Sequence, residues 1–350
     1  MKILHIVWVL RFGGIETMLM NITHEQIELG HEVAILLIDE GSADLELIKR
    51  KDSKVQMFFA NRKYGKWDIP AYVRMNRIVK QYDPDVVHLH SAAMYKYLCP
   101  LQRRSCNVTL HALCNKPNTD HIGKIDKVFA ISQSVADDLM QKRHIKSIVN
   151  PNGINPELIK TKDKDAKQGM PFRIVQVSRL DHPKKGQHIL LEACGVLKQR
   201  GYENFTIDFI GGGASLEYLK SVAGKLELSD RVNFLGMKDQ QYIYDHLCEY
   251  DLFVQPSIYE GFGLTVAEAM AAKVAVLVSS GQGPEEVVDY GKCGSVFRNG
   301  DVEDCANKIE MYLKNEDDKT FINKAFNRVW NLYNVKIMVK TYLDNYSKRK

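Results

Sequence analysis

The chain has 350 residues, a formal net charge of +5 from 48 basic and 43 acidic residues, and 45% hydrophobic residues. This length exceeds the roughly 250–300 residues at which one hydrophobic core stops growing, so two domains are expected. The composition is typical of a soluble globular protein and excludes global disorder. The small positive excess is compatible with an anionic ligand or an anionic membrane surface, and we expect no nucleic-acid partner.

The start of the chain and its cysteines predict a cytoplasmic protein. Residues 3–10 form an apolar run that ends in Arg11-Phe12-Gly13-Gly14, without the small-residue cleavage site of a secretory leader. We therefore interpret this run as a buried first strand. The seven cysteines contain no CxxC pair, which favours reduced thiols over a zinc ribbon or a thioredoxin-type motif. No stretch approaches the roughly 20 apolar residues of a membrane span.

Short apolar runs alternate with helical patterns through the first half of the chain. Strands are predicted at 3–10, 33–38, 55–60, 86–90, 108–111, 128–131 and 147–150, and helices at 15–29, 70–82 and 134–142. On the helix at 70–82 and the residue before it, the apolar positions expected to face the core are Ile69, Tyr72, Val73, Ile78 and Val79. This rhythm predicts a parallel sheet with helices on both faces.

A polar, turn-rich segment between Pro151 and Pro171 is interpreted as a linker. The alternation of strands and helices then restarts. Strands are predicted at 174–177, 206–210, 232–235, 252–255, 274–278 and 295–297, with helices that include 187–200 and 216–226, and a final helix is predicted at 335–346. The predicted fold class is therefore α/β with two Rossmann-like domains.

Several motifs of other functions are incomplete. The dinucleotide fingerprint fails at its last glycine after Gly211-Gly212-Gly213, and no Gly-Lys pair is followed by the Ser or Thr of a P-loop. Asp83-Pro84-Asp85 leads into a strand, where proline and aspartate simply end the preceding helix. His88 and His90 share one face of a strand. With His111 they could suggest a metal cluster, but no helical HExxH-type partner exists, so no metal site is predicted.

The segment around Glu260 and Glu268 carries the most information about function. Glu260 lies in a turn after a predicted strand, and Glu268 lies inside the following helix. Gly261 and Gly263 between them allow the backbone to approach a ligand closely. The helix begins near Leu264, so its free N–H groups and the positive end of its dipole suit a diphosphate. The alternative interpretation is a capped helix with two solvated glutamates.

A basic cluster follows the first predicted strand of the second domain and contains Arg179 and Lys185. In an open α/β sheet the ligand crevice lies outside the carboxyl ends of the strands. Both cations are therefore expected at the same end of the sheet as Glu260. Two fixed cations at that place would neutralise a departing diphosphate without a metal ion. A solvated charged loop is the alternative.

Together these residues resemble the retaining nucleotide-sugar glycosyltransferases of family four, which have the two-domain GT-B fold. The segment 260–268 looks like the family's E-x7-E signature, and Arg179 and Lys185 have the spacing of its donor-phosphate pair. Gly13-Gly14 looks like its N-terminal glycine loop, and Leu110-His111 ends a strand where the family places its active-site histidine. The resemblance spans nearly the whole chain, and the order of the motifs makes it specific.

The sequence departs from the family pattern at two places, and neither is among the site residues that carry the resemblance. Asn155 replaces an aspartate that often follows the family's Asn-Gly-Ile, and Gly211-Gly212-Gly213 leaves no acidic side chain in the central glycine loop. The resemblance implies two facing domains with an inter-domain cleft. Residues 1–160 would form the acceptor-side domain, together with a helix at 335–350 that crosses back, and residues 170–334 would bind the donor.

The resemblance also implies a role for each site residue. Glu268 would bind the ribose hydroxyls and Glu260 the sugar hydroxyls, while His111 would lie near the anomeric carbon. The residues implied to bind the donor are Gly13, Gly14, Arg179, Lys185, Gly236, Met237, Lys238, Glu260, Phe262, Gly263, Leu264 and Glu268. Catalysis would rest on His111, Arg179, Lys185 and Glu260. No metal ion and no cofactor are expected, because the nucleotide sugar is itself a co-substrate.

The sequence thus predicts a retaining, metal-independent transferase that moves a hexosyl unit from a nucleotide-diphosphate sugar, with UDP favoured. A glycan or lipid-linked acceptor is expected, as in bacterial surface polysaccharide or glycolipid synthesis. The alternatives are a nucleotide-sugar epimerase of related fold and a non-catalytic nucleotide-sugar-binding protein. Basic residues interleaved with aromatic ones at 62–67 and 95–104 suggest peripheral contact with the inner face of an anionic cell membrane, and a solvated helix with a partly buried Trp67 is the alternative.

Overall fold

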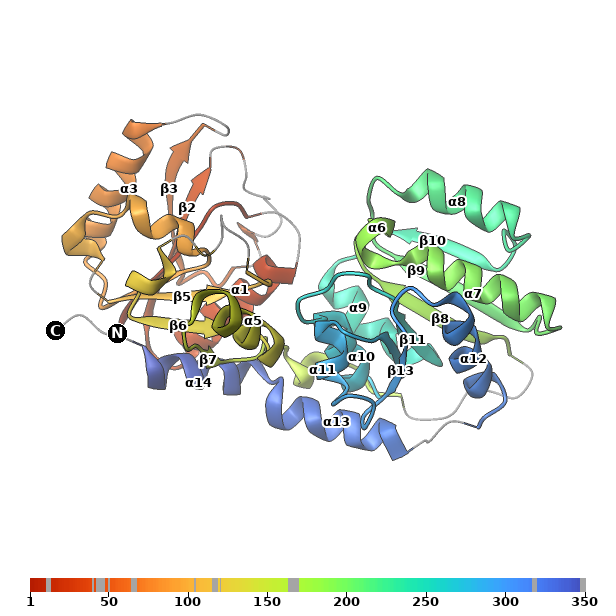
Figure 1. Ribbon diagram of the computed structural model, residues 1–350. Helices are drawn as coiled ribbons and strands as arrows, with labels where there is room; N and C mark the ends of the chain where they lie inside the picture. The colour runs from red at the N-terminus through yellow and green to blue at the C-terminus, as the bar shows by residue number, and fades with distance from the viewer. Residues whose placement is uncertain are drawn as a thin grey trace. The chain divides into compact units, whose positions relative to one another are not determined.

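The computed structural model describes residues 1–10, 14–39, 41, 48–49, 51–63, 68–103, 105–114, 119, 121–162, 170–316 and 320–346 (Figure 1). The chain divides into two compact units. Unit 1 comprises Met1–Ile154 and Val335–Lys350, and unit 2 comprises Asn155–Asn334. Each unit is built on its own parallel sheet, which confirms the predicted class of two Rossmann-like α/β domains.

The sheet of unit 1 has seven strands in the order β3-β2-β1-β4-β5-β6-β7. The strands are β1 (Lys2–Val7), β2 (Glu32–Asp39), β3 (Gln56–Arg62), β4 (Val86–Leu89), β5 (Cys106–Leu110), β6 (Lys127–Ala130) and β7 (Ile148–Val149), all parallel to their neighbours. The strand order reverses between β1 and β4. Open α/β sheets bind ligands beyond the carboxyl ends of strands at such a reversal.

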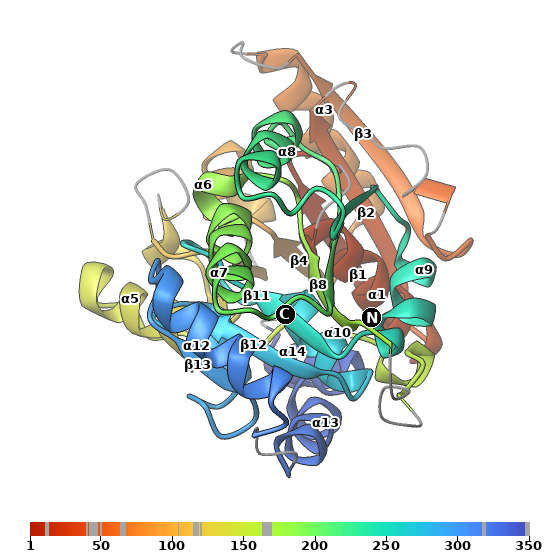
Figure 2. The same cartoon turned by 90° about the vertical axis from the view of Figure 1, so that its right-hand side faces the viewer.

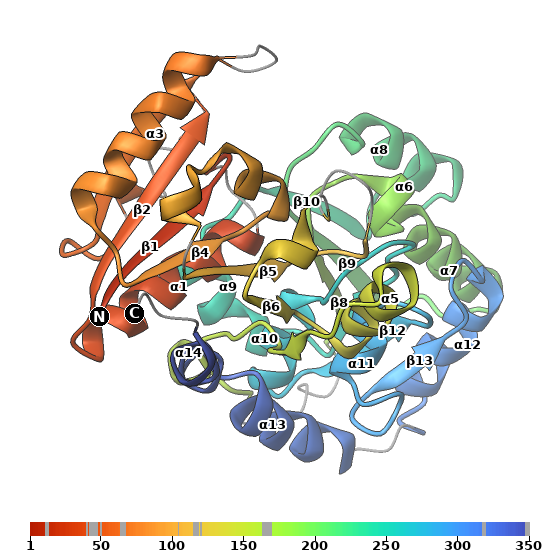
Figure 3. The ribbon, with the colours of Figure 1, turned by 60° about the vertical axis from the view of Figure 1, so that its left-hand side comes forward.

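Among the described residues, four helices and three short 3-10 helices accompany this sheet. They are α1 (Gly14–Glu28), α3 (Ile69–Tyr82), α5 (Gln133–Arg143), α14 (Val335–Asn345), η1 (Ala92–Tyr97), η2 (Pro100–Gln102) and η3 (Ile122–Lys124). Helix α14 packs beside α1, and α3 lies along β3 and β2 (Figure 3). Met338, Val339 and Tyr342 of α14 join Ile3 and Ile22 in one buried cluster. The last described helix therefore completes the core of unit 1.

The sheet of unit 2 has six strands in the order β10-β9-β8-β11-β12-β13, again all parallel. Its strands are β8 (Phe172–Val177), β9 (Phe205–Ile210), β10 (Val232–Gly236), β11 (Leu252–Gln255), β12 (Ala275–Ser279) and β13 (Ser295–Phe297). The order reverses between β8 and β11. The segments after these two strands carry the predicted donor-binding residues.

The helices of unit 2 cover its sheet, and α7 and α12 lie side by side (Figure 2). The elements are η4 (Pro156–Leu158), α6 (His182–Lys185), α7 (Gln187–Gln199), α8 (Leu216–Lys225), α9 (Gln240–His246), η5 (Leu247–Glu249), α10 (Leu264–Ala271), α11 (Gly283–Val287), α12 (Val302–Leu313) and α13 (Thr320–Leu332). Residues 155–162, which fell within the predicted linker, pack on this unit. The backbone N–H groups of Lys160 and Lys162 donate to the carbonyls of Tyr244 and Ala272.

Two differences from the sequence predictions have simple physical reasons. No element was predicted between 298 and 334, yet Asp301 caps α12 through the N–H of Asp304 at 2.9 Å, and α13 follows. On α3 the predicted core face is wrong at two positions, because Ile69 is 64% and Val73 52% exposed. The buried side of α3 instead runs through Ala71, Met75, Val79 and Tyr82.

Candidate functional site

Two turns of unit 2 meet at the carboxyl ends of β8 and β11. The backbone N–H groups of Ile258 and Tyr259 donate to the carbonyl oxygen of Lys184, at 2.9 and 3.1 Å. The turn after α6 is tight, since a Cβ atom on Gly186 would lie 1.8 Å from the carbonyl oxygen of Pro256. These contacts place the end of α6 directly against the turn that precedes α10.

The contact between these turns joins two of the predicted site residues. The ammonium of Lys185 forms an ion pair with the carboxylate of Glu260, and the two side chains are only 18% and 21% exposed. Two hydrogen bonds fix the backbone of Glu260. Its N–H donates to Gln282 Oε1 at 3.0 Å, and its carbonyl oxygen accepts from the N–H of Gly283 at 2.9 Å. Gln282 was not predicted, since only the folded turn brings it to Glu260.

Arg179 follows β8, at the same end of the sheet. Its backbone is fixed, because Gln187 Nε2 donates to its carbonyl oxygen at 2.9 Å. Its side chain is 68% exposed, and its nearest carboxylate partner is Asp181 at 4.0 Å. Arg179 thus extends into solvent from a rigid base, whereas Lys185 is already engaged with Glu260.

Helix α10 begins at a glycine in a left-handed conformation. Gly263 has φ of 99°, which favours glycine, and a Cβ atom there would meet Pro284 at 3.0 Å. Within the described residues, no protein acceptor faces the backbone N–H groups of Phe262, Gly263 and Leu264. The first N–H groups of a helix suit an anion. The predicted anion site therefore stands next to the Lys185–Glu260 pair.

Glu268 is buried inside α10, four residues beyond Leu264. Burial raises the pKa of its carboxyl group to about 8, against a hydrogen bond from the side chain of Gln240, which lowers it. Gln240 is the first residue of α9 and lies two residues after the segment Gly236-Met237-Lys238, which the resemblance implies as a donor-binding loop. In that loop Gly236 has φ of 70°, Met237 is exposed, and Lys238 Nζ lies 4.8 Å from the ring centre of Tyr242.

In unit 1, His111 stands just beyond the carboxyl end of β5. Its Nε2 lies 3.1 Å from Nδ1 of His90, and its Nδ1 is buried without a hydrogen-bond partner in the described part of the chain. Burial lowers the pKa of His111 to about 4. The ring is therefore neutral at neutral pH, and its buried Nδ1 lacks a hydrogen-bond partner among the described residues.

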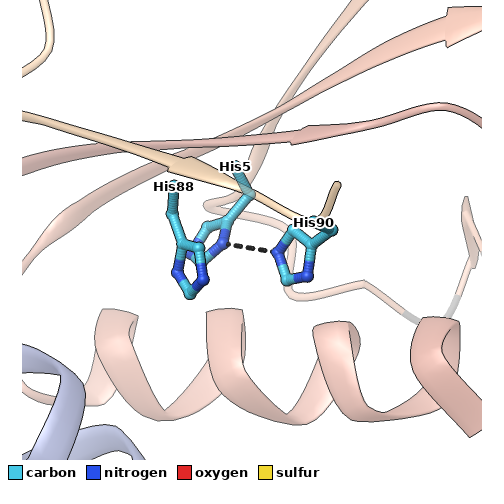
Figure 4. Close-up of side chains that lie close together, drawn as sticks. All are labelled: His5, His88 and His90. Carbon is cyan, nitrogen blue, oxygen red and sulfur yellow. Dashed lines mark hydrogen bonds between the residues drawn. The ribbon is translucent and has the colours of Figure 1, made fainter. Parts of the chain in front are cut away.

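His90 belongs to a group of three imidazoles whose rings lie side by side (Figure 4). His5 of β1 pairs in register with His88 of β4. Ring nitrogens of His5, His88 and His90 lie within 4.8 Å of one another, close enough to suggest a metal ion. Every one of these nitrogens has a protein hydrogen-bond partner, however. Hydrogen bonding thus accounts for the cluster, and sequence reasoning missed the part of His5.

The predicted glycine loop of unit 1 falls at the edge of the described residues. Gly14 is the first residue of α1, whereas Gly13 lies outside the described residues. Gly14 follows β1, and His90 and His111 follow β4 and β5. All three therefore stand at the carboxyl ends of neighbouring strands, around the reversal of strand order.

Curated proteins named as glycosyltransferases are similar to part of the chain. It is 35% identical over 172 residues to an amylovoran biosynthesis glycosyltransferase, AmsK, of Erwinia amylovora, covering 47% of this chain and 42% of that protein. It is 29% identical over 164 residues to a GDP-mannose-dependent phosphatidylinositol monomannoside mannosyltransferase of Mycobacterium tuberculosis, covering 45% and 42%. The matched region thus spans less than half the length of these relatives.

Solved structures share the fold over nearly the whole chain. The Anabaena protein Alr3699/HepE in complex with UDP and glucose has a TM-score of 0.83 at 21% identity, with 98% of both chains covered. A glycosyltransferase from Rickettsia africae has a TM-score of 0.82 at 22% identity, with 98% of this chain and 97% of that chain covered.

Two family models match consecutive parts of the sequence. The model described as Glycosyltransferase Family 4 matches residues 12–158, and the model described as Glycosyl transferases group 1 matches residues 159–328. Together with the two parallel sheets and the order of the motifs, these matches show that the chain belongs to the family 4 glycosyltransferases of GT-B fold.

Proposed function

We propose that this protein is a retaining glycosyltransferase that takes a hexosyl unit from a nucleotide-diphosphate sugar, with UDP as the favoured nucleotide. The observation that carries the proposal is the Lys185–Glu260 pair beside the N–H groups at the start of α10, which have no acceptor among the described residues. A cation and a helix N-terminus together suit a diphosphate, and the adjacent carboxylate suits sugar hydroxyls.

In this proposal unit 2 binds the donor. The amides of Phe262–Leu264 hold the diphosphate, and Lys185 turns from Glu260 toward it. Arg179, on its rigid backbone, adds the second cation. Glu260, released from Lys185, accepts hydrogen bonds from the sugar. Preorganised donors aimed at the charge that develops on a leaving group supply a large part of such a rate enhancement.

Unit 1 contributes His111 to the reaction. The acceptor hydroxyl attacks the anomeric carbon on the face from which the nucleotide departs. The new C–O bond forms as the bond to the phosphate oxygen breaks, and that phosphate oxygen takes the proton of the hydroxyl. The hydrogen-bond partner of His111 is an imidazole rather than a carboxylate, which supports front-face attack over a covalent intermediate on a carboxylate.

The same proposal leaves out a metal ion. Lys185, Arg179 and the α10 N-terminus supply the positive charge that a divalent ion would bring to the diphosphate. The chain would then work without a cofactor, with the nucleotide sugar as co-substrate. The test is to measure turnover in excess EDTA: we expect full activity, and a loss that manganese or magnesium restores would overturn this part of the proposal.

The acceptor is proposed from the relatives. One of them acts in amylovoran biosynthesis and another on a phosphatidylinositol monomannoside, so a glycan or a lipid-linked acceptor fits this chain. None of the helices in the described part of the chain has the length and apolar character that a membrane crossing needs. Exposed Ile69, Val73 and Lys63 at and near α3 support a peripheral contact with an anionic membrane surface.

One experiment separates this function from its alternatives, an epimerase and a silent nucleotide-sugar-binding protein. Purified protein is incubated with a nucleotide sugar, with and without a panel of glycan and lipid-linked acceptors, and free nucleoside diphosphate is measured. A transferase releases it only when acceptor is supplied. Epimerisation of the sugar without release, or binding without any turnover, would refute the assignment.

A further inference from the structure

Eight side chains of unit 1 form one continuous series of hydrogen bonds that ends on His111. In order they are Tyr342, Thr109, His88, Tyr346, Gln26, His5, His90 and His111, with successive contacts of 3.0, 2.8, 2.7, 3.4, 2.9, 3.1 and 3.1 Å. They come from β1, from β4 and β5 and the residue after each of these two strands, from α1, and from α14 and the residue after it. The first six are buried in the core.

The hydrogen bond between Tyr346 and His88 determines which group donates and which accepts in the hydrogen bonds that follow. Between a phenol and a neutral imidazole, the phenol O–H is the better donor and the imidazole lone pair the better acceptor. Tyr346 therefore donates to Nδ1 of His88, and its oxygen accepts from the amide NH2 of Gln26. The opposite amide orientation would turn two acceptors toward each other. The carbonyl oxygen of Gln26 thus faces His5.

The orientation of the Gln26 amide determines the tautomers of three imidazole rings, those of His5, His90 and His111. A neutral imidazole has one donor and one acceptor nitrogen. His5 donates from Nε2 to Gln26 Oε1, so its Nδ1 accepts from Nε2 of His90. Nδ1 of His90 then accepts from Nε2–H of His111. Burial lowers the pKa of His5 to about 4 and that of His90 well below its usual value, so these rings are neutral at neutral pH.

We propose that Gln26, oriented by Tyr346, fixes His111 as the Nε2–H tautomer through His5 and His90, and so presents Nδ1 of His111 as the acceptor for a hydroxyl group of the sugar substrate. This inference rests on the proposed function. His111 is the residue that touches substrate, and Gln26, His5 and His90 are positioning residues. A buried acceptor without a partner is unfavourable, and Nδ1 of His111 has none in the described part of the chain, so a substrate hydroxyl would supply the donor.

The alternative occupant of this cluster is a transition-metal ion held by His5, His88 and His90. Such an ion would need a lone pair from each ring. His88 would have to give up its bond to Tyr346 or to Thr109, at 2.7 and 2.8 Å. The hydrogen-bonded arrangement satisfies all three rings without this loss. Elemental analysis of the purified protein decides the matter, because a stoichiometric metal would overturn the proposal.

The direct test is the tautomer of His111, read by nitrogen NMR of the full-length protein labelled at histidine, with His111→Gln assigning its signals. We expect the proton of His111 on Nε2 in the wild-type protein, and a proton on Nδ1 would overturn the proposal. This readout needs no turnover. A failed transferase assay with the expected tautomer would therefore refute the proposed function alone.

Variants of Gln26 then test the relay. Gln26→Met removes the acceptor for His5, so we expect His111 to show both tautomers and kcat/KM to fall about tenfold, as for one lost hydrogen bond. Gln26→Glu keeps an acceptor and should restore the single tautomer. Tyr342→Phe is the matched control, because it removes a buried hydroxyl at the far end of the series. The proposal would be overturned if the tautomer of His111 is unchanged in Gln26→Met, or if Tyr342→Phe disturbs it equally. If Gln26→Met fails to fold, the spectrum of the wild-type protein decides.

Discussion

The side chains beyond the carboxyl ends of the strands are neutral in unit 1 and charged in unit 2. In unit 1 the strand ends carry imidazoles that burial keeps neutral, joined by hydrogen bonds. In unit 2 they carry formal charge, with Lys185 against Glu260 and Arg179 extended into solvent. In the proposed function the charged groups of unit 2 bind the diphosphate and sugar hydroxyls of the donor, whereas unit 1 offers a sugar hydroxyl the neutral acceptor nitrogen of His111. The same strand order thus serves two different tasks, because the residues that follow the strands differ.

The largest effect is expected from removing charge in unit 2. Lys185→Ala and Arg179→Ala should each lower turnover by about 10²–10³, the usual cost of losing one preorganised donor at a developing charge. Lys184→Ala is the matched control, since its side chain is 60% exposed and its ion pair with Asp181 measures 3.8 Å. Turnover of both site variants close to that of Lys184→Ala would show that these cations do not assist the leaving group.

The two units should respond to pH with opposite sign. In unit 1 the folded pKa values of His5 and His111, about 4, lie below the ordinary histidine value of 6.5. The unfolded state then binds more protons, so stability is lost as pH falls from about 6.5 toward 4. In unit 2 the folded pKa of Glu268, about 8, lies above the ordinary glutamate value of 4.5, so stability is lost as pH rises from about 4.5 to 8.

Each such group contributes a slope of at most about 1.4 kcal/mol per pH unit. Hydrogen exchange read by mass spectrometry as a function of pH reports the two units separately. Glu268→Gln stays neutral throughout and should remove the alkaline loss in unit 2 while leaving the acid loss in unit 1. A parallel response of both units, or an alkaline loss that persists in Glu268→Gln, would remove this distinction.

The next effect divides the roles of the two glutamates. Glu260→Ala should weaken binding of the intact nucleotide sugar about tenfold, because a carboxylate hydrogen bond to the sugar is lost. It should not weaken free nucleoside diphosphate, since Lys185 is then freed from its partner. Glu268→Ala should weaken both ligands alike. Calorimetry that finds equal losses for both ligands in Glu260→Ala would contradict the proposed contact with sugar.

The smallest effect is expected at a membrane surface. We expect weak, salt-sensitive binding of the protein to anionic vesicles, at about 1 kcal/mol for each basic residue near the surface. Charge reversal of Lys63 together with Lys66, which lies outside the described residues, should reduce binding in a sedimentation assay. Reversal of Lys220 and Lys225 on α8 is the control. If anionic and neutral vesicles sediment equal amounts of protein at low salt, the membrane contact is refuted.

The sequence predicted the charged site more fully than the neutral one, and the reason is contiguity. Glu260, Gly263 and Glu268 lie on one strand–turn–helix segment, so their spacing already carries the geometry. Lys185 needed only the general rule that strand ends of a parallel sheet share one edge. The α12 helix was also readable, because Asp301 precedes apolar positions at helical spacing, but it was not recognised.

The hydrogen-bonded histidines could not be predicted from residue spacing, because they do not lie on one contiguous segment. His5 and His88 lie on two strands and His111 directly follows a third, and their order in the chain does not show which ring nitrogens are hydrogen-bonded to each other. Gln26 and Tyr346 enter from helical segments at opposite ends of the sequence. The exposure of Ile69 and Val73 likewise depends on which side of α3 meets β3. Periodicity describes a helix but not its rotation against a sheet.

Helix α14 has a consequence for how the protein is made. Unit 1 combines Met1–Ile154 with Val335–Lys350, so the whole of unit 2 is synthesised before α14. Domains generally fold as units during synthesis, with N-terminal ones first. The N-terminal sheet therefore cannot complete its core until α14 has been synthesised, because the surface that packs against Tyr342 and Met338 stays uncovered until then. Unit 2 already has all its strands at that stage. A nascent chain arrested before Val335 should therefore acquire nucleotide-binding ability ahead of the ability to transfer a sugar.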